Sequence, residues 1–229
     1  MIKFGNFIVT DNNSWLGESS SPGPTPPTPV LPAGTVRVRT SDGNAPIKEL
    51  FTAYETATLV EGTSDVYDVY KSGTSFMNLL RESSNVVEVL GANTIGITDM
   101  QTMFDSCTSL TTVPLFDTSS VTYMSNMFYG CSSLTTVPLF DTSSVTYMDH
   151  MFDGCSSLTS IPLFDTTNVT YIGYAFRDCV NVESGALALY QQASSQTTPP
   201  SSHSRTFRNC GRDTVTGAAE LAQIPNDWK

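Results

Sequence analysis

The chain has 229 residues and a formal net charge of −11. Its 11 Lys and Arg against 22 Asp and Glu argue against sequence-independent nucleic-acid binding, which needs basic side chains to displace phosphate counterions. Only 2 histidines are available for a metal site or a catalytic triad, and the common nucleotide-binding, zinc-protease and serine-hydrolase motifs are missing. The sequence therefore predicts a protein that is not an enzyme, with no catalytic residues, no cofactor and no metal.

Residues 1–17 are too apolar for a free tail and too short for a core of their own. They predict an anchor segment that packs on another subunit as a strand or ribbon. The anchor positions are Ile2, Phe4, Phe7, Val9 and Trp15. The start of the chain lacks the features of a secretion signal, which favours a protein that does not use the general export route. A chain whose signal has been removed is the alternative.

Residues 18–34 hold closely spaced prolines and predict a semi-rigid linker that projects the rest of the chain away from the anchor. Residues 35–78 predict a small β-rich, mixed α/β module, with strands at 35–40 and 66–70 and a short helix at 47–54. No apolar run approaches the ~20 residues of a transmembrane helix, so no membrane insertion is expected.

Residues 79–183 repeat with a period of 24. Three nearly identical copies open at Met103, Met127 and Met151. Within a copy, apolar residues of 121–131 recur at helical spacing after an Asp-Thr-Ser-Ser sequence that can cap a helix. Residues 134–137 predict a strand that ends at Pro138, so that 111–113 and 135–137 should pair in parallel. One strand and one helix in 24 residues predict an α/β leucine-rich-repeat solenoid. Residues 184–229 predict a C-terminal cap that begins with a helix after Gly185.

The repeat M-F-x-x-C-x-S-L-T-x-[VI]-P-L-F-D-T-[ST]-x-V-T-x-[MI] is similar to the BspA-type leucine-rich repeats of bacterial surface proteins and some bacteriophage proteins. The resemblance implies adhesion and binding to a host or matrix. With no export signal and a projecting linker, we expect a non-enzymatic structural or decoration protein of a bacteriophage virion, attached to other virion subunits through its N-terminal segment. The alternative is a BspA-type adhesin on a bacterial cell surface whose signal has been removed.

Two columns of identical residues raise the question of bonds or ligands. The first is Cys107, Cys131, Cys155 and Cys179. Buried free thiols are favoured over disulfides or zinc, because equivalent side chains point the same way and no Cys-x-x-Cys pair is present. The second is Asp117, Asp141 and Asp165. Helix caps or turn bonds are favoured there, with calcium ligands as the alternative.

Positions that differ between copies are expected to face solvent and to form a contact patch. These are Tyr129, Asp149, His150, Asp153 and Tyr174. Their aromatic and polar groups predict weak adhesion to a host or mucosal surface polymer, unless most of them are simply unconstrained. A rival surface is the hydroxyl column of Thr111, Thr135 and Thr159, which holds no aromatic residue. The arginines around Phe207 are assigned to the cap, with a basic binding patch as the alternative.

Overall fold

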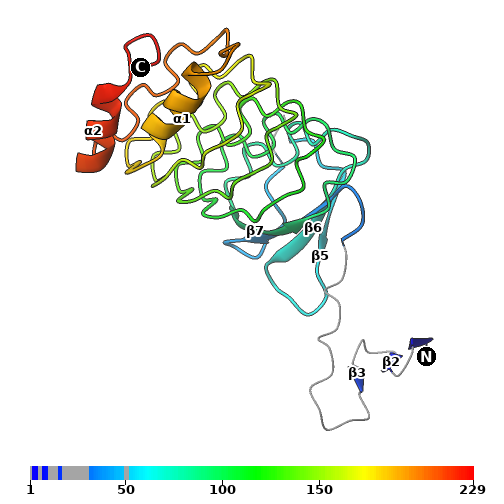
Figure 1. The fold of residues 1–229 in the computed structure, drawn as a ribbon. Helices are drawn as coiled ribbons and strands as arrows, with labels where there is room; N and C mark the ends of the chain where they lie inside the picture. Colours follow the sequence, from blue (N-terminus) through cyan, green and yellow to red (C-terminus); the bar gives the residue numbers. More distant parts are fainter. Residues whose placement is uncertain (1, 5–6, 10–14, 17–30, 49–51) are drawn as a thin grey trace. The chain divides into compact units, whose positions relative to one another are not determined.

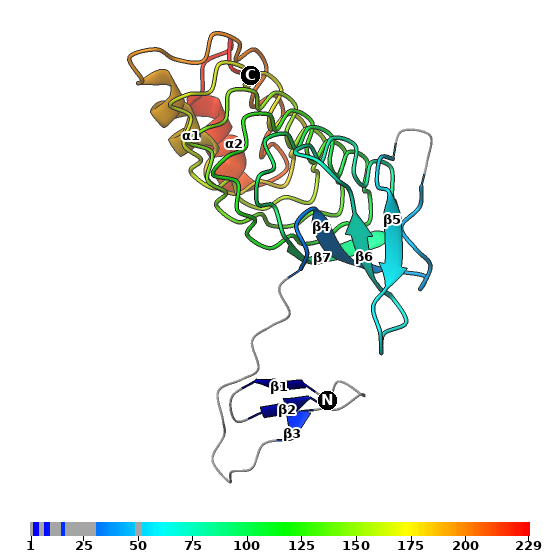
Figure 2. The same cartoon turned by 90° about the vertical axis from the view of Figure 1, so that its right-hand side faces the viewer.

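The computed structural model describes residues 2–4, 7–9, 15–16, 31–48 and 52–229. The chain divides into two units, Met1–Val30 and Leu31–Lys229. In the first unit, the strands β1 (Ile2–Phe4), β2 (Phe7–Val9) and β3 (Trp15–Leu16) form an antiparallel sheet in the order β1-β2-β3 (Figure 2). The predicted anchor positions lie in these strands. Residues 18–30 of the predicted linker lie outside the described residues.

The second unit begins with a four-stranded antiparallel sheet in the order β5-β6-β4-β7 (Figure 2). Its strands are β4 (Thr35–Thr40), β5 (Thr56–Leu59), β6 (Val66–Tyr70) and β7 (Val86–Ala92). The strands predicted at 35–40 and 66–70 are confirmed. The helix predicted at 47–54 is wrong where it is described, because residues 47–48 and 52–54 are not helical; residues 49–51 lie outside the described part of the chain.

From Ser75 onward the chain winds into a stack of 24-residue coils, and β7 lies in the first of them (Figure 1). Glu88 of β7 forms a parallel bridge with Thr112, which joins the sheet to the coils. Further parallel bridges run from coil to coil through Ser75, Asp99, Tyr123, Tyr147, Tyr171 and Ser202. The last step is longer than 24 residues because the helix α1 (Ala186–Ser194) is inserted there. This helix confirms the one predicted after Gly185.

The prediction of an α/β leucine-rich-repeat solenoid, with a helix and a strand in every repeat, is wrong. Within the described residues, the only helices are α1 and α2 (Val215–Gln223), and both follow the three full repeats. Residues 121–131 form a series of turns. The N–H groups of Met124 and Asn126 donate to carbonyls of the next coil, at 2.9 and 3.0 Å. Positive φ angles at Asn126 (58°) and Gly130 (67°) stop a right-handed helix from continuing.

The strands predicted within the repeats are also wrong. Residues 111–113 and 135–137 do not pair as parallel strands, and between them the N–H of Thr135 donates to the carbonyl of Thr111 at 3.2 Å. The nearby prolines offer no N–H to a ladder, so this side of the coil stays irregular. What holds neighbouring coils together is instead the set of hydrogen bonds between turns.

The core of the stack is a column of phenylalanine rings, one from each coil. Successive ring centroids lie 5.3–5.8 Å apart, and the rings are nearly parallel. The members are Phe104, Phe128, Phe152, Phe176 and Phe207. A second column of Phe116, Phe140 and Phe164 packs beside it. Trp228 covers the last ring of the first column at 6.3 Å, so the C-terminal segment closes the apolar core.

Two positions in each coil have a left-handed backbone, and the second, which includes Ser106 and Gly130, follows the first by four residues. At the first position φ lies between 53° and 63°. The residues in this column are Asn78, Thr102, Asn126, His150, Tyr174 and Arg205. Asparagine adopts this conformation readily, whereas most other L-residues pay roughly 1–2 kcal/mol for it. The last three coils therefore hold bulky side chains, His150, Tyr174 and Arg205, at a position where asparagine would be easier to accommodate.

Candidate functional site

The cysteine column is confirmed as buried, free thiols. Each thiol donates a hydrogen bond to a carbonyl of the preceding coil, as Cys107 does to Leu80 at 3.0 Å and Cys131 to Phe104 at 3.1 Å. Burial raises the pKa of Cys131 well above its ordinary value, with a smaller contribution from Cys107. Because only the thiolate is a good nucleophile or metal ligand, these side chains serve the packing of the coils.

The aspartate column forms turn bonds. Asp117 Oδ1 accepts hydrogen bonds from the Ser119 hydroxyl at 2.7 Å and from the Ser119 N–H at 3.2 Å. These two bonds, the hydroxyl first, lower the pKa of Asp117. The turn interpretation is confirmed, while helix capping is wrong because no helix follows. No group of three or more His, Cys, Asp or Glu side chains able to hold a metal ion occurs in the described part of the chain.

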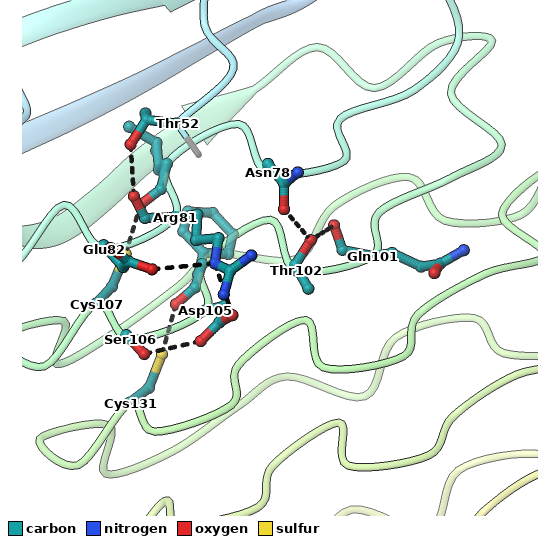
Figure 3. A network of polar contacts seen from close by, with 12 residues as sticks. Thr52, Asn78, Arg81, Glu82, Gln101, Thr102, Asp105, Ser106, Cys107 and Cys131 are labelled. Carbon is teal, nitrogen blue, oxygen red and sulfur yellow. Dashed lines mark hydrogen bonds and ion pairs between the residues drawn. The ribbon is translucent and has the colours of Figure 1, made fainter. Parts of the chain in front are cut away.

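Charged side chains of one column pair between neighbouring coils (Figure 3). Arg81 Nε lies 3.0 Å from Asp105 Oδ2. Burial raises the pKa of Asp105, while the hydrogen bond from Ser106 and the charge of Arg81 act in the opposite direction. One coil further on, the uncharged Tyr129 takes the equivalent position and separates Asp105 from the next acid of the column, Asp153.

Asp153 was expected to face solvent, but the structure buries it: only 2% of the residue is exposed. Its Oδ1 accepts from Arg177 Nε at 2.8 Å, and its Oδ2 lies 2.8 Å from both Arg177 Nη2 and His150 Nδ1. The hydrogen bond to Asp153 raises the pKa of Arg177. Asp153 therefore fixes the side chains of His150 and Arg177 from inside the protein and is not available to a ligand.

The predicted contact patch comes together around three rings, which we call the aromatic column: Tyr129, His150 and Tyr174. The rings of His150 and Tyr174 stack with centroids 4.6 Å apart, and the Tyr129 ring lies 6.4 Å from that of His150 at an angle of 57°. Asp149, also predicted for the patch, accepts a hydrogen bond from Ser125 Oγ at 2.6 Å.

Arg205 completes the end of the aromatic column and was missed as part of the patch. Its Nη1 donates to Tyr174 Oη at 3.0 Å, and its guanidinium carbon lies 5.7 Å from the centre of the Tyr174 ring. Arg205 follows Tyr174 by 31 residues instead of 24, so the two positions are not recognised as equivalent from the period of the repeat. The available signal was Phe207, which stacks on Phe176 and marks the register across the insertion.

A second surface column was missed altogether: Tyr123, Tyr147 and Tyr171. Their ring centroids lie 5.1 and 4.9 Å apart, and 41% of Tyr123 and of Tyr171 is exposed. Because these rings are identical in every copy, their position resembled that of a core residue. Stacked rings of this kind offer mainly edges and hydroxyls, since the ring faces between neighbours are covered.

Comparison with protein-family models matches residues 72–194 to the family described as "Mycoplasma protein of unknown function, DUF285". The match spans more than half of the chain. The chain belongs to the DUF285 family. This assignment supports the BspA-like character of the repeats, and the DUF285 region contains the whole aromatic column but ends before Arg205.

Other comparisons add nothing to the DUF285 assignment. No significant match was found among curated proteins or among solved structures. Among the described residues of this DUF285 chain, no helix has the length and apolar character that crossing a membrane requires.

Proposed function

We propose that this DUF285 protein is a non-enzymatic adhesion module that binds a surface polymer through the aromatic column. The observation that carries the proposal is that three successive coils place Tyr129, His150 and Tyr174 side by side at the surface. Tyrosine and histidine combine an apolar ring with hydrogen-bonding groups, which suits contact with a hydroxylated or amide-bearing polymer.

The scaffold supports this role because the column is held from inside the protein. His150 is linked to the buried Asp153, and Tyr174 is held between His150 and the guanidinium groups of Arg177 and Arg205. Side chains fixed in this way lose little conformational freedom on binding. A single patch of this size is expected to bind weakly, and display in many copies would raise the effective affinity.

For the place of display we propose a bacteriophage virion, with the bacterial cell surface as the second candidate. The projecting linker predicted at residues 18–34 supports display on a particle. The description of the DUF285 family names Mycoplasma, a bacterium, and favours the cell surface. The neighbouring genes separate the two: capsid or tail genes would support the virion, and genes for cell-envelope proteins would contradict it.

The adhesion site is tested with a triple variant, Tyr129→Ser, His150→Asn, Tyr174→Asn. Asparagine is chosen at 150 and 174 because Asn78 and Asn126 adopt the same left-handed backbone in other coils. We expect the multimerised variant to lose at least tenfold in binding to bacterial or mucosal glycans on an array, because the ring contacts are removed. Circular dichroism and thermal unfolding of both proteins establish that the fold is kept.

The matched control changes the other ring column, Tyr123, Tyr147 and Tyr171, to serine. This control should bind as the unchanged protein does. Binding lost in the control and kept in the triple variant would move the site to the tyrosine column. If the unchanged multimer bound no surface polymer at all, the adhesion function itself would be wrong.

We propose that attachment to the particle or cell resides in residues 1–17, whose strands β1, β2 and β3 form a unit separate from the coils. Deletion of residues 1–30 is expected to abolish incorporation into the particle while the second unit, Leu31–Lys229, remains folded. Co-purification of the truncated and full-length chains with the particle measures this. Normal incorporation of the truncated chain would show that attachment lies elsewhere.

A further inference from the structure

Two arginines stand out from the charge pattern of the coil unit. Every other arginine forms an ion pair within 4 Å: Arg37, Arg39, Arg81, Arg177 and Arg212. Arg205 and Arg208 form none with any described residue, and both are exposed. In a chain with 22 acidic against 11 basic residues, internal partners are abundant, so two unpaired guanidinium groups leave positive charge for an external anion.

Both arginines lie on the last coil, at the end of the aromatic column. The N–H of Arg208 donates to the carbonyl of Arg205 at 3.2 Å, so one turn carries both side chains. Arg205 is oriented by its bond to Tyr174 Oη and by the Tyr174 ring. The single contact with the phenol uses one of the five N–H donors of this guanidinium, and a planar fork of donors fits a carboxylate in a bidentate manner.

The backbone at this place is an independent observation. His150, Tyr174 and Arg205 occupy the left-handed column with φ of 55°, 63° and 58°. Bulky residues held in that conformation are uncommon and cluster at ligand-binding sites, where the surrounding structure maintains the strain. Among the ten described non-glycine residues with positive φ, these three form the stacked ring pair and its guanidinium neighbour.

The charge of the whole chain restricts which class of ligand can bind at the last coil. From Glu82 through Phe176 there is no Lys or Arg, and nine acids occur in that stretch. A polyanion lying along the coils would be repelled by this surface, whereas a ligand with one negative group can reach the last coil alone. The exposed Ser204 adjoins Arg205 in the chain, and the exposed Ser201 precedes Arg205 by four residues; both suit a ligand rich in hydroxyl groups.

We propose that Arg205 and Arg208, together with Tyr174, bind the carboxylate of a terminal acidic sugar on an otherwise uncharged glycan. The proposal rests on the adhesion function above and names the ligand class of that site. The carboxylate pairs with the two guanidinium groups, and the sugar hydroxyls bond to Tyr174 Oη and the adjacent serines.

The test compares 3′-sialyllactose with lactose, which lacks the acidic sugar, by calorimetric titration of the full chain. We expect sialyllactose to bind at least tenfold more tightly than lactose, and its affinity to fall as salt is raised. Arg205→Gln and Arg208→Gln should each lower the sialyllactose affinity by about tenfold. Arg212→Gln is the matched control and should change nothing, because Arg212 is paired with Asp213 at 3.4 Å.

Three results would overturn the proposal. If the protein bound both saccharides equally, or bound neither, the carboxylate would not be the recognised group. Unchanged binding by both Arg→Gln variants would place the site elsewhere. Equal binding of a short oligoglutamate peptide would remove the sugar from the assignment. The adhesion function is judged separately from its ligand. If the multimer still bound a surface polymer, and binding still depended on Tyr129, His150 and Tyr174, the adhesion function would hold with a different ligand.

Discussion

Phe152→Ala is expected to lower the free energy of unfolding by about 3–5 kcal/mol. The ring is fully buried in the middle of the phenylalanine column, with the rings of Phe128, Phe164 and Phe176 at centroid distances of 5.3, 6.0 and 5.4 Å. Removing it leaves a cavity between two coils. The backbone hydrogen bonds between turns fix the spacing of the coils, so collapse into that cavity is limited.

Urea unfolding of the two proteins measures the difference, provided that the slope with denaturant stays the same. Leu163→Ala in the same repeat is the control, because 53% of Leu163 is exposed, and its effect should stay within about 0.5 kcal/mol. If Phe152→Ala lowered the free energy of unfolding by less than about 1 kcal/mol, the coils would relax independently, which would contradict a continuous core.

The repeat and its buried face could be predicted from the sequence because period and hydrophobicity determine both. A period of 24 with Phe and Cys in fixed phases requires equivalent residues to stack, whatever the local backbone is. The buried thiols followed from this argument, as did the closure of the core by the C-terminal segment. The strands at 35–40 and 66–70 and the helix after Gly185 followed from ordinary local patterns.

The backbone within a repeat could not be predicted from the same pattern. Apolar residues three and four positions apart indicate a helix, but turns of three residues place side chains on one face with the same spacing. The distinction lies in single residues, namely Asn126 and Gly130, whose left-handed φ angles interrupt the helix. Gly130 occurs inside the predicted helix, where glycine is unfavourable, and was the available sign against it.

The candidate site was predicted only in part because variation between copies is a poor measure of exposure. The position of Asp153 varies from copy to copy, with Tyr129 before it and Arg177 after it, yet Asp153 is buried because it pairs with Arg177 across coils. Tyr123 is identical to its equivalents and is 41% exposed. A repeat copies surface residues as faithfully as core residues, so burial had to come from the structure.

Arg177→Met is expected to lower the free energy of unfolding by about 3–5 kcal/mol at neutral pH. Arg177 is the cation that pairs with Asp153 through two of its nitrogens at 2.8 Å, and 2% of Asp153 is exposed. Without the guanidinium, the carboxylate keeps the contact with His150 Nδ1 alone, and a buried charge without a cationic partner is costly.

The double variant Arg177→Met, Asp153→Asn separates this cost from the loss of packing. Removing both charges should recover a substantial part of the stability, because the penalty of Arg177→Met comes from the carboxylate left behind. Urea unfolding of the two single variants and the double variant gives the coupling energy. The exposed pair of Arg212 and Asp213 is the control, and Arg212→Met should cost less than about 1 kcal/mol. If Arg177→Met cost no more than Arg212→Met, the pair of Arg177 and Asp153 would contribute no more than an exposed pair, and it would not be what holds the aromatic column in place.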